Sequence, residues 1–166
     1  MPTPENLKEA FAGESQANRR YLAFAQKAEA DGFPQVARLF RAVAEAETVH
    51  AHNHFRAMGG IKGTADNLKT AMDGESYEFK SMYPPFLAAA EKEGQAAAAR
   101  GFKYALEVEK IHYELYSKAL ESVRSGKDLP PAPLYVCPVC GHTVIGEPPD
   151  RCPLCGVPKD KYREIR

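Results

Sequence analysis

ETVH at residues 47–50 and EKIH at residues 109–112 are two copies of one motif, Glu-x-x-His, in a chain of 166 residues. Residues three apart share a face of a helix, so each copy presents a carboxylate and an imidazole to the same point. Apolar residues recur at helical spacing on both sides of each copy, which places both motifs inside long helices. Such side chains on an inward face indicate a metal site in the core of a helical bundle.

Four long helices are predicted from this periodicity. The first ends at residue 31, the second begins at residue 34, the third carries its stripe over residues 68–89 with a kink at Pro84-Pro85, and the fourth spans residues 96–123. Short links between long helices favour an antiparallel bundle, and the glycine-rich link between the second and third helices is the expected longer crossover.

Glutamates also lie on the inward faces of the first and third helices. Glu14 is on the first, and Glu75 and Glu78 are on the third at the spacing of the Glu-x-x-His motifs. A buried, ionised glutamate costs several kcal/mol, roughly, unless it is paired or bound to a metal. Carboxylate-bridged di-metal bundles use one glutamate from each of two helices and Glu-x-x-His from the other two, so this chain has the full set and one further carboxylate.

An internal repeat relates the two halves of the helical region. A shift of 62 residues superimposes the two Glu-x-x-His motifs and aligns Tyr21 with Tyr83. Glu14 departs from this register, because the shift places it on Ser76, one residue after Glu75. A one-residue insertion of this kind is typical of a π-bulge, so we expect one in a helix near the site.

The composition excludes several classes of protein. Lys+Arg and Asp+Glu are both 22, and a net charge of zero does not suit a protein that neutralises nucleic-acid phosphates. No apolar run approaches the roughly 20 residues of a membrane span, and the N-terminus lacks a signal-peptide pattern. We therefore expect no nucleic acid, no membrane and a cytoplasmic location, where thiols stay reduced.

A change of composition marks a second, smaller domain. Eight of the 13 prolines and all four cysteines follow Asp128, which predicts a helical domain over residues 1–128 and a small metal domain over residues 129–166. The proline-rich segment at residues 128–133 is expected to be a stiff, extended linker.

The tail carries two cysteine knuckles, CPVCG at residues 137–141 and CPLCG at residues 152–156. Four thiolates at this spacing make a tetrahedral metal site, and the glycines allow backbone N–H groups to approach sulfur. The spacing by itself suits either an iron centre or a structural zinc ribbon. His142, directly after the first knuckle, is expected at the surface.

These motifs together resemble the rubrerythrin family. The similarity covers nearly the whole chain and is carried by AGESQA at residues 12–17, GESYE at residues 74–78 leading to MYP at residues 82–84, both Glu-x-x-His motifs and both knuckles. It implies an all-α, ferritin-like four-helix bundle with a small C-terminal rubredoxin-like β/knuckle metal domain.

The resemblance implies a role for each residue of the two metal sites. Glu47 and Glu109 would bridge two irons, and Glu78 and His50 would alternate as ligands of one of them. The terminal ligands would be Glu14, Glu75 and His112. Hydrogen bonds to ligand carboxylates would come from Tyr21 and Tyr83. One further iron, or zinc after heterologous expression, would be held by Cys137, Cys140, Cys152 and Cys155.

By the same resemblance, the chain is expected to be a non-haem di-iron peroxidase that reduces hydrogen peroxide to water in oxidative-stress defence. Its electrons would come from an upstream donor protein and pass through the rubredoxin-like iron. The stiff linker at Pro130-Pro131 is expected to prevent the tail from folding back onto its own helices, so a homodimer with electron transfer between chains is predicted.

Two other functions fit parts of the sequence. A ferritin-like ferroxidase or iron store with a structural zinc-ribbon tail needs the helical glutamates but not Glu78 or a redox-active tail. A non-catalytic zinc-ribbon adaptor needs only the four cysteines.

Overall fold

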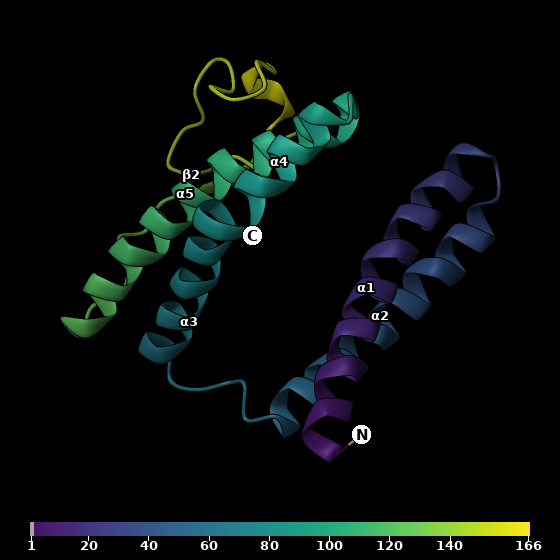
Figure 1. Cartoon of the computed structure of the whole chain (residues 1–166), viewed down its shortest axis with the longest axis horizontal. Helices are drawn as coiled ribbons and strands as arrows, with labels where there is room; N and C mark the ends of the chain where they lie inside the picture. The colour runs from purple at the N-terminus through teal and green to yellow at the C-terminus, as the bar shows by residue number, and fades with distance from the viewer. Residues whose placement is uncertain (1) are drawn as a thin grey trace. The chain divides into compact units, whose positions relative to one another are not determined.

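The structure, a computed structural model, describes residues 2–166 and contains two compact units, Met1–Lys62 and Gly63–Arg166. In Figure 1 the first unit runs from purple to blue and the second from teal to yellow. The units meet in the chain at the predicted crossover, not at the change of composition near Asp128. A domain boundary at residues 128–129 therefore stays a prediction. None of the described helices is long and apolar enough to cross a bilayer.

The first unit is a helical hairpin of α1 (Thr3–Ala30) and α2 (Pro34–Ala57). Gly32, with φ of 85°, makes the turn between them in a conformation that other residues rarely adopt. The buried Asn18 Nδ2 of α1 donates hydrogen bonds to the carbonyl oxygen of Ala44, at 2.7 Å, and to the Thr48 hydroxyl, at 2.8 Å, both on α2. These bonds fix the register of the hairpin. The residues buried along it are small, which allows close helix packing: Ala25, Ala28, Ala37, Ala44 and Ala51.

The helices of the second unit are α3 (Thr64–Tyr77), α4 (Tyr83–Lys92) and α5 (Ala96–Arg124). A π-helical turn, η1 (Glu78–Met82), joins α3 to α4 without a break. The predicted π-bulge is therefore confirmed. Its extra residue lies between Glu75 and Tyr83, which explains why Glu14 and Glu75 are 61 positions apart while Tyr21 and Tyr83 are 62 apart.

Matching aromatic triads confirm that the two hairpins are structural repeats. In the first unit the three ring pairs have centroid distances of 6.3, 6.2 and 5.6 Å, within Tyr21, Phe24 and Phe40. In the second unit the corresponding distances are 6.5, 6.2 and 5.7 Å, within Tyr83, Phe86 and Phe102.

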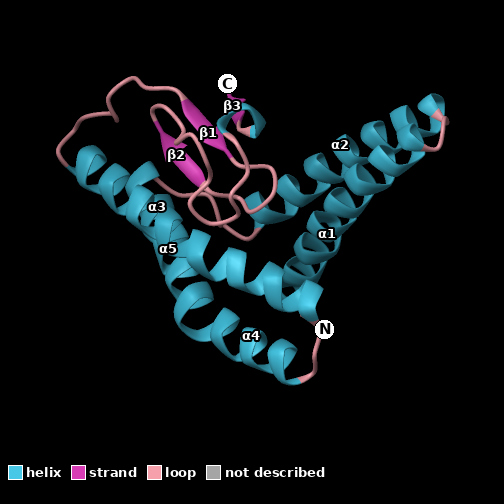
Figure 2. Ribbon diagram, turned by 90° about the horizontal axis from the view of Figure 1, so that it is seen from above, coloured by secondary structure: helices cyan, strands magenta, loops and turns pink. Residues whose placement is uncertain are grey.

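The tail of the second unit is a three-stranded antiparallel sheet in the order β2-β1-β3 (Figure 2). Its strands are β1 (Leu134–Val136), β2 (Thr143–Ile145) and β3 (Arg163–Ile165), and a 3-10 turn, η2 (Lys159–Lys161), precedes β3. The first knuckle connects β1 to β2, with Val136 paired to Thr143. The small core comprises Cys137, Cys152 and Tyr162.

The tail packs against α5 of its own chain. A groove between them is lined by Ile111 and Leu115 of α5 and by Val144 and Ile145 of β2. The expectation that the linker would prevent this contact was wrong. The prolines fix the local backbone, but residues 125–133 still turn the chain back along α5, with the Ser122 hydroxyl donating to the carbonyl oxygen of Asp128 at 2.9 Å.

Candidate metal centres

The first unit brings Glu14, Glu47 and His50 together on facing sides of α1 and α2. One ligand atom from each lies within 4.8 Å of the others. His50 Nδ1 is 2.8 Å from Glu47 Oε2 on the same helix and 3.8 Å from Glu14 Oε1 on α1. The three predicted ligands of this half of the chain therefore form one cluster.

The second unit repeats this arrangement with Glu75, Glu109 and His112. His112 Nδ1 is 2.6 Å from Glu109 Oε2 on α5 and 3.9 Å from Glu75 Oε1 on α3. The ligand atoms again lie within 4.8 Å of one another. In both clusters Nδ1 is the imidazole nitrogen that faces the carboxylates. Two carboxylates and one imidazole are a donor set that suits iron, manganese or zinc, so each cluster fits one such ion.

The three side chains of the second cluster shift one another's pKa values. Burial, together with a hydrogen bond to Glu109 and that residue's charge, raises the pKa of Glu75 to about 7. For Glu109, hydrogen bonds from His112 and Glu75 outweigh the effect of burial and lower its pKa. The hydrogen bond to Glu109 raises the pKa of His112 against its desolvation. In the absence of a cation, the cluster is thus stabilised by holding protons.

Glu78 and Tyr83 lie beside this cluster at the two sides of the π-helical turn. Burial, followed by the charge of Glu109, raises the pKa of the Glu78 carboxyl. Burial and then the charges of Glu78, Glu109 and Glu75 raise the pKa of the Tyr83 phenol. Glu78 is not within the three-residue cluster, and hydrogen bonds from Tyr21 or Tyr83 to ligand carboxylates stay a prediction.

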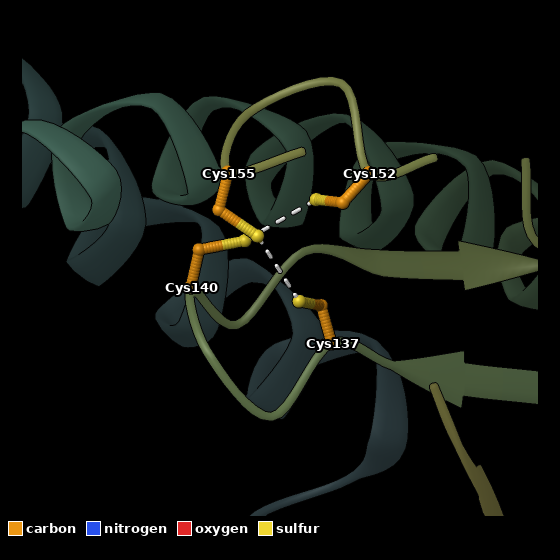
Figure 3. A group of neighbouring side chains, drawn as sticks. All are labelled: Cys137, Cys140, Cys152 and Cys155. Atoms are coloured by element: carbon orange, nitrogen blue, oxygen red, sulfur yellow. Dashed lines mark hydrogen bonds between the residues drawn. The ribbon is translucent and has the colours of Figure 1, made fainter. Parts of the chain in front are cut away.

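The four cysteines of the tail converge on one point (Figure 3). The Sγ atoms of Cys137 and Cys155 are 3.5 Å apart, as are those of Cys140 and Cys152. Thiolates at about 2.3 Å from a tetrahedral ion are about 3.8 Å from one another, whereas a disulfide is about 2 Å long. The geometry therefore fits a single four-coordinate metal ion.

The two knuckles have the same backbone hydrogen bonds. The amides of Cys137 and Cys152 donate to the carbonyls of His142 and Val157 at 2.9 and 2.8 Å. The glycines that close the knuckles, Gly141 and Gly156, have φ of 84° and 77°, which the turn requires. Main-chain hydrogen bonds thus give the two knuckles the same conformation.

A buried histidine–tyrosine pair supports the thiolate site. His142 Nδ1 is 2.7 Å from the Tyr162 hydroxyl, and both side chains are buried. The expectation that His142 lies at the surface was wrong, because its side chain is buried against that of Tyr162. Burial acts to raise the pKa of Cys152, but hydrogen bonds, first that from Tyr162, lower it to about 6. Tyr162 was not predicted from the sequence, where the available signal was an aromatic residue seven positions after Cys155.

Comparisons with known proteins agree with both parts of this structure. The family model described as Rubrerythrin matches residues 5–120, and the model described as Rubrerythrin, rubredoxin-like domain matches residues 135–163. The chain is 41% identical to rubrerythrin-2 of Clostridium acetobutylicum, over 97% of this chain and 95% of that protein. It is 34% identical to nigerythrin of Nitratidesulfovibrio vulgaris, over 96% of this chain and 85% of that protein.

A solved structure of fully reduced, all-ferrous nigerythrin is similar with a TM-score of 0.59 and 33% identity, covering 99% of this chain and 87% of that one. These matches confirm the predicted fold class, a ferritin-like helical fold followed by a rubredoxin-like knuckle domain.

The pKa of Glu75 is 4.5 in the unfolded chain and about 7 in the folded protein. Metal-free protein is therefore expected to lose stability as pH rises between these two values. Over this range the folded protein keeps a proton that the unfolded chain has released, so the stabilisation disappears as pH passes the folded-state pKa. The raised pKa values of Glu78 and His112 act in the same direction, while the lowered pKa of Glu109 matters at more acidic pH. Urea unfolding of chelator-treated protein measures this slope.

Glu75→Gln should flatten the slope, because glutamine keeps the shape but does not titrate. Asp73→Asn, at an exposed position on the same helix, is the control and should leave the slope unchanged. An equally steep loss of stability in Glu75→Gln would contradict the assignment.

Replacing Cys137 and Cys140 with serine is expected to remove the metal of the tail and to spare the metals of the Glu/His clusters, because the sites have no ligand in common. Metal analysis with visible spectroscopy measures the change, from three metals per fully loaded chain to two. Loss of all metals together would show that the sites are not independent.

Proposed function

The chain belongs to the rubrerythrin family, and on that premise we propose that it is a peroxidase that reduces hydrogen peroxide to water. The observation that carries the proposal is that one chain combines two Glu/Glu/His clusters with a four-thiolate cluster. The reaction needs two electrons and two protons to convert one peroxide into two waters. In such a chain the Glu/His clusters would be the site of peroxide reduction, and the four-thiolate cluster would supply the electrons that return them to the reduced state.

The residues divide between these two tasks. Glu14, Glu47 and His50 hold one iron, and the corresponding residues of the second unit, Glu75, Glu109 and His112, hold another. When bound, these two ferrous ions supply the two electrons that cleave the O–O bond. Glu78 is the further carboxylate available beside the second cluster. Its alternation with His50 as an iron ligand stays a prediction, as do the bridging roles of Glu47 and Glu109.

The four cysteines hold the iron that passes electrons to the Glu/His clusters, which we call the relay. Their single iron stores one electron, so it must be reduced twice by an upstream donor protein for each peroxide consumed. Hydrogen bonds to sulfur hold the site rigid, which limits rearrangement as its charge changes.

Iron-loaded protein, reduced without oxygen, is expected to consume one peroxide per pair of electrons and to release no dioxygen. Glu109→Gln should lower this rate by more than the about 10–100-fold typical for a residue that only supports a metal ligand. Glu107→Gln is the matched control, because Glu107 pairs with Lys110 at 2.8 Å and is not in the cluster.

Stopped-flow absorbance with peroxide titration measures both variants. If reduced protein reacts with dioxygen in preference to peroxide and added ferrous ions grow into a mineral, the ferritin-like oxidase replaces this proposal.

The tail's position favours electron delivery to the cluster on its own α5. We propose this route in place of transfer between chains, within the homodimer expected from the sequence. It gives a clear expectation for mixed dimers of Glu109→Gln and Cys152→Ser, whose changed residues lie in the same unit. The chain with an intact relay then serves a defective cluster, and the chain with an intact cluster has no relay.

Mixed dimers should therefore be as inactive as either parent when an upstream reductase supplies the electrons. Native mass spectrometry confirms subunit exchange. Recovery of activity would establish delivery between chains, and full activity of Cys152→Ser alone would make the tail structural.

A further inference from the structure

Two polar contacts join the first knuckle of the tail to the metal cluster of α5. The His112 ring hydrogen-bonds to the backbone of Gly141, and it also contacts Thr143. His112 Nε2 lies 2.9 Å from the Thr143 hydroxyl oxygen at the start of β2. The other ring nitrogen, Nδ1, faces Glu109 and Glu75. The imidazole therefore lies between the carboxylates and the tail.

The hydrogen bonds of Thr143 and Gly141 together determine that the His112 nitrogen facing the tail carries a proton. A hydroxyl has one proton, and that of Thr143 is donated to the carbonyl oxygen of Gly141 at 3.0 Å. Toward His112 the hydroxyl oxygen can then only accept, so Nε2 carries a proton. In the absence of a cation Nδ1 donates to Glu109, and a metal bound on the side of the carboxylates would take the place of that proton.

The knuckle places Thr143 with little freedom. Strand pairing with Val136 fixes its backbone, and Gly141 is in van der Waals range of α5, since a Cβ built on it would be 3.6 Å from Val108 Cγ1. Val108 is buried one turn before His112. The first knuckle, the hydroxyl and α5 thus form one packed contact.

The same segment reaches a sulfur of the tail. The amide of His142 hydrogen-bonds to Cys140, which acts against burial on the pKa of that thiol. Thr143 directly follows His142 in the chain. Two adjacent residues therefore contact the two metal sites: the His142 amide hydrogen-bonds to Cys140, and the Thr143 hydroxyl contacts His112.

We propose that Thr143 is a positioning residue that fixes the Nε2-protonated form of His112 and holds the first knuckle against the α5 cluster. The proposal rests on the proposed function for the identity of the metals, but the contact itself does not depend on peroxide chemistry. Zinc-loaded protein provides a test without iron, because every site is then diamagnetic.

The first measurement is NMR of zinc-loaded protein with ¹⁵N-labelled histidine. In the wild type, Nε2 of His112 should carry a slowly exchanging proton and Nδ1 should carry none. Thr143→Ser keeps the hydroxyl and should preserve this signal. Thr143→Val keeps the shape without the hydroxyl and should speed the exchange at least about tenfold, with a similar loss of zinc affinity in the cluster.

Thr70→Val is the matched control, because the Thr70 hydroxyl donates only to the carbonyl oxygen of Asp66 within α3, at 2.9 Å. It should match the wild type. A proton on Nδ1 in wild-type protein overturns the proposal whether or not any variant folds. So does a Thr143→Ser protein that behaves like Thr143→Val, since shape and not the hydroxyl would then decide.

The second measurement is the rate at which iron in the reduced tail is reoxidised by an oxidised cluster. Stopped-flow absorbance should show at least a tenfold decrease in Thr143→Val and wild-type rates in Thr143→Ser and Thr70→Val. Unchanged transfer in a folded Thr143→Val protein overturns the docking role. If the wild type does not reduce peroxide at all, the proposed function fails while the NMR result still decides the role of Thr143.

Discussion

Both halves of the helical region depend on a short contact between a histidine Nδ1 and the glutamate one turn before it, 2.8 Å at His50 and 2.6 Å at His112. The contact exists only if both residues share a face of a regular helix. It also brings charge to a face that packs against another helix. That helix adds a second carboxylate, so each cluster needs a cation or protons to balance its negative charge. The second carboxylate is Glu14 in the first unit and Glu75 in the second.

Much of this could be predicted because it is periodic. Helical spacing predicts which residues share the inward face of each helix. The repeat of 62 residues predicts which residues of the two hairpins are equivalent. The π-helical turn was predictable for the same reason, since the one-residue difference between the Glu14–Glu75 and Tyr21–Tyr83 spacings has few other physical solutions. The knuckles were predictable because four cysteines at fixed spacing constrain one another.

The features that the sequence did not predict depend on contacts between segments distant in the chain. His142 is buried against Tyr162, which follows it by 20 residues and lies outside both knuckles. The path of the linker depends on the groove along α5, whereas prolines restrict only their own and the preceding residue. Thr143 carried no signal in the sequence, since a threonine in a short strand is ordinary.

The two kinds of centre solve the same electrostatic problem with different ligands. Metal binding needs ionised carboxylates at one centre and ionised thiols at the other, yet burial raises the pKa of Glu75 and of Cys140 and so opposes ionisation at both. Fixed hydrogen bonds offset part of this cost at one member of each cluster, lowering the pKa values of Glu109 and Cys152. The remaining charge needs a cation. Folding and metal binding are therefore coupled at each centre.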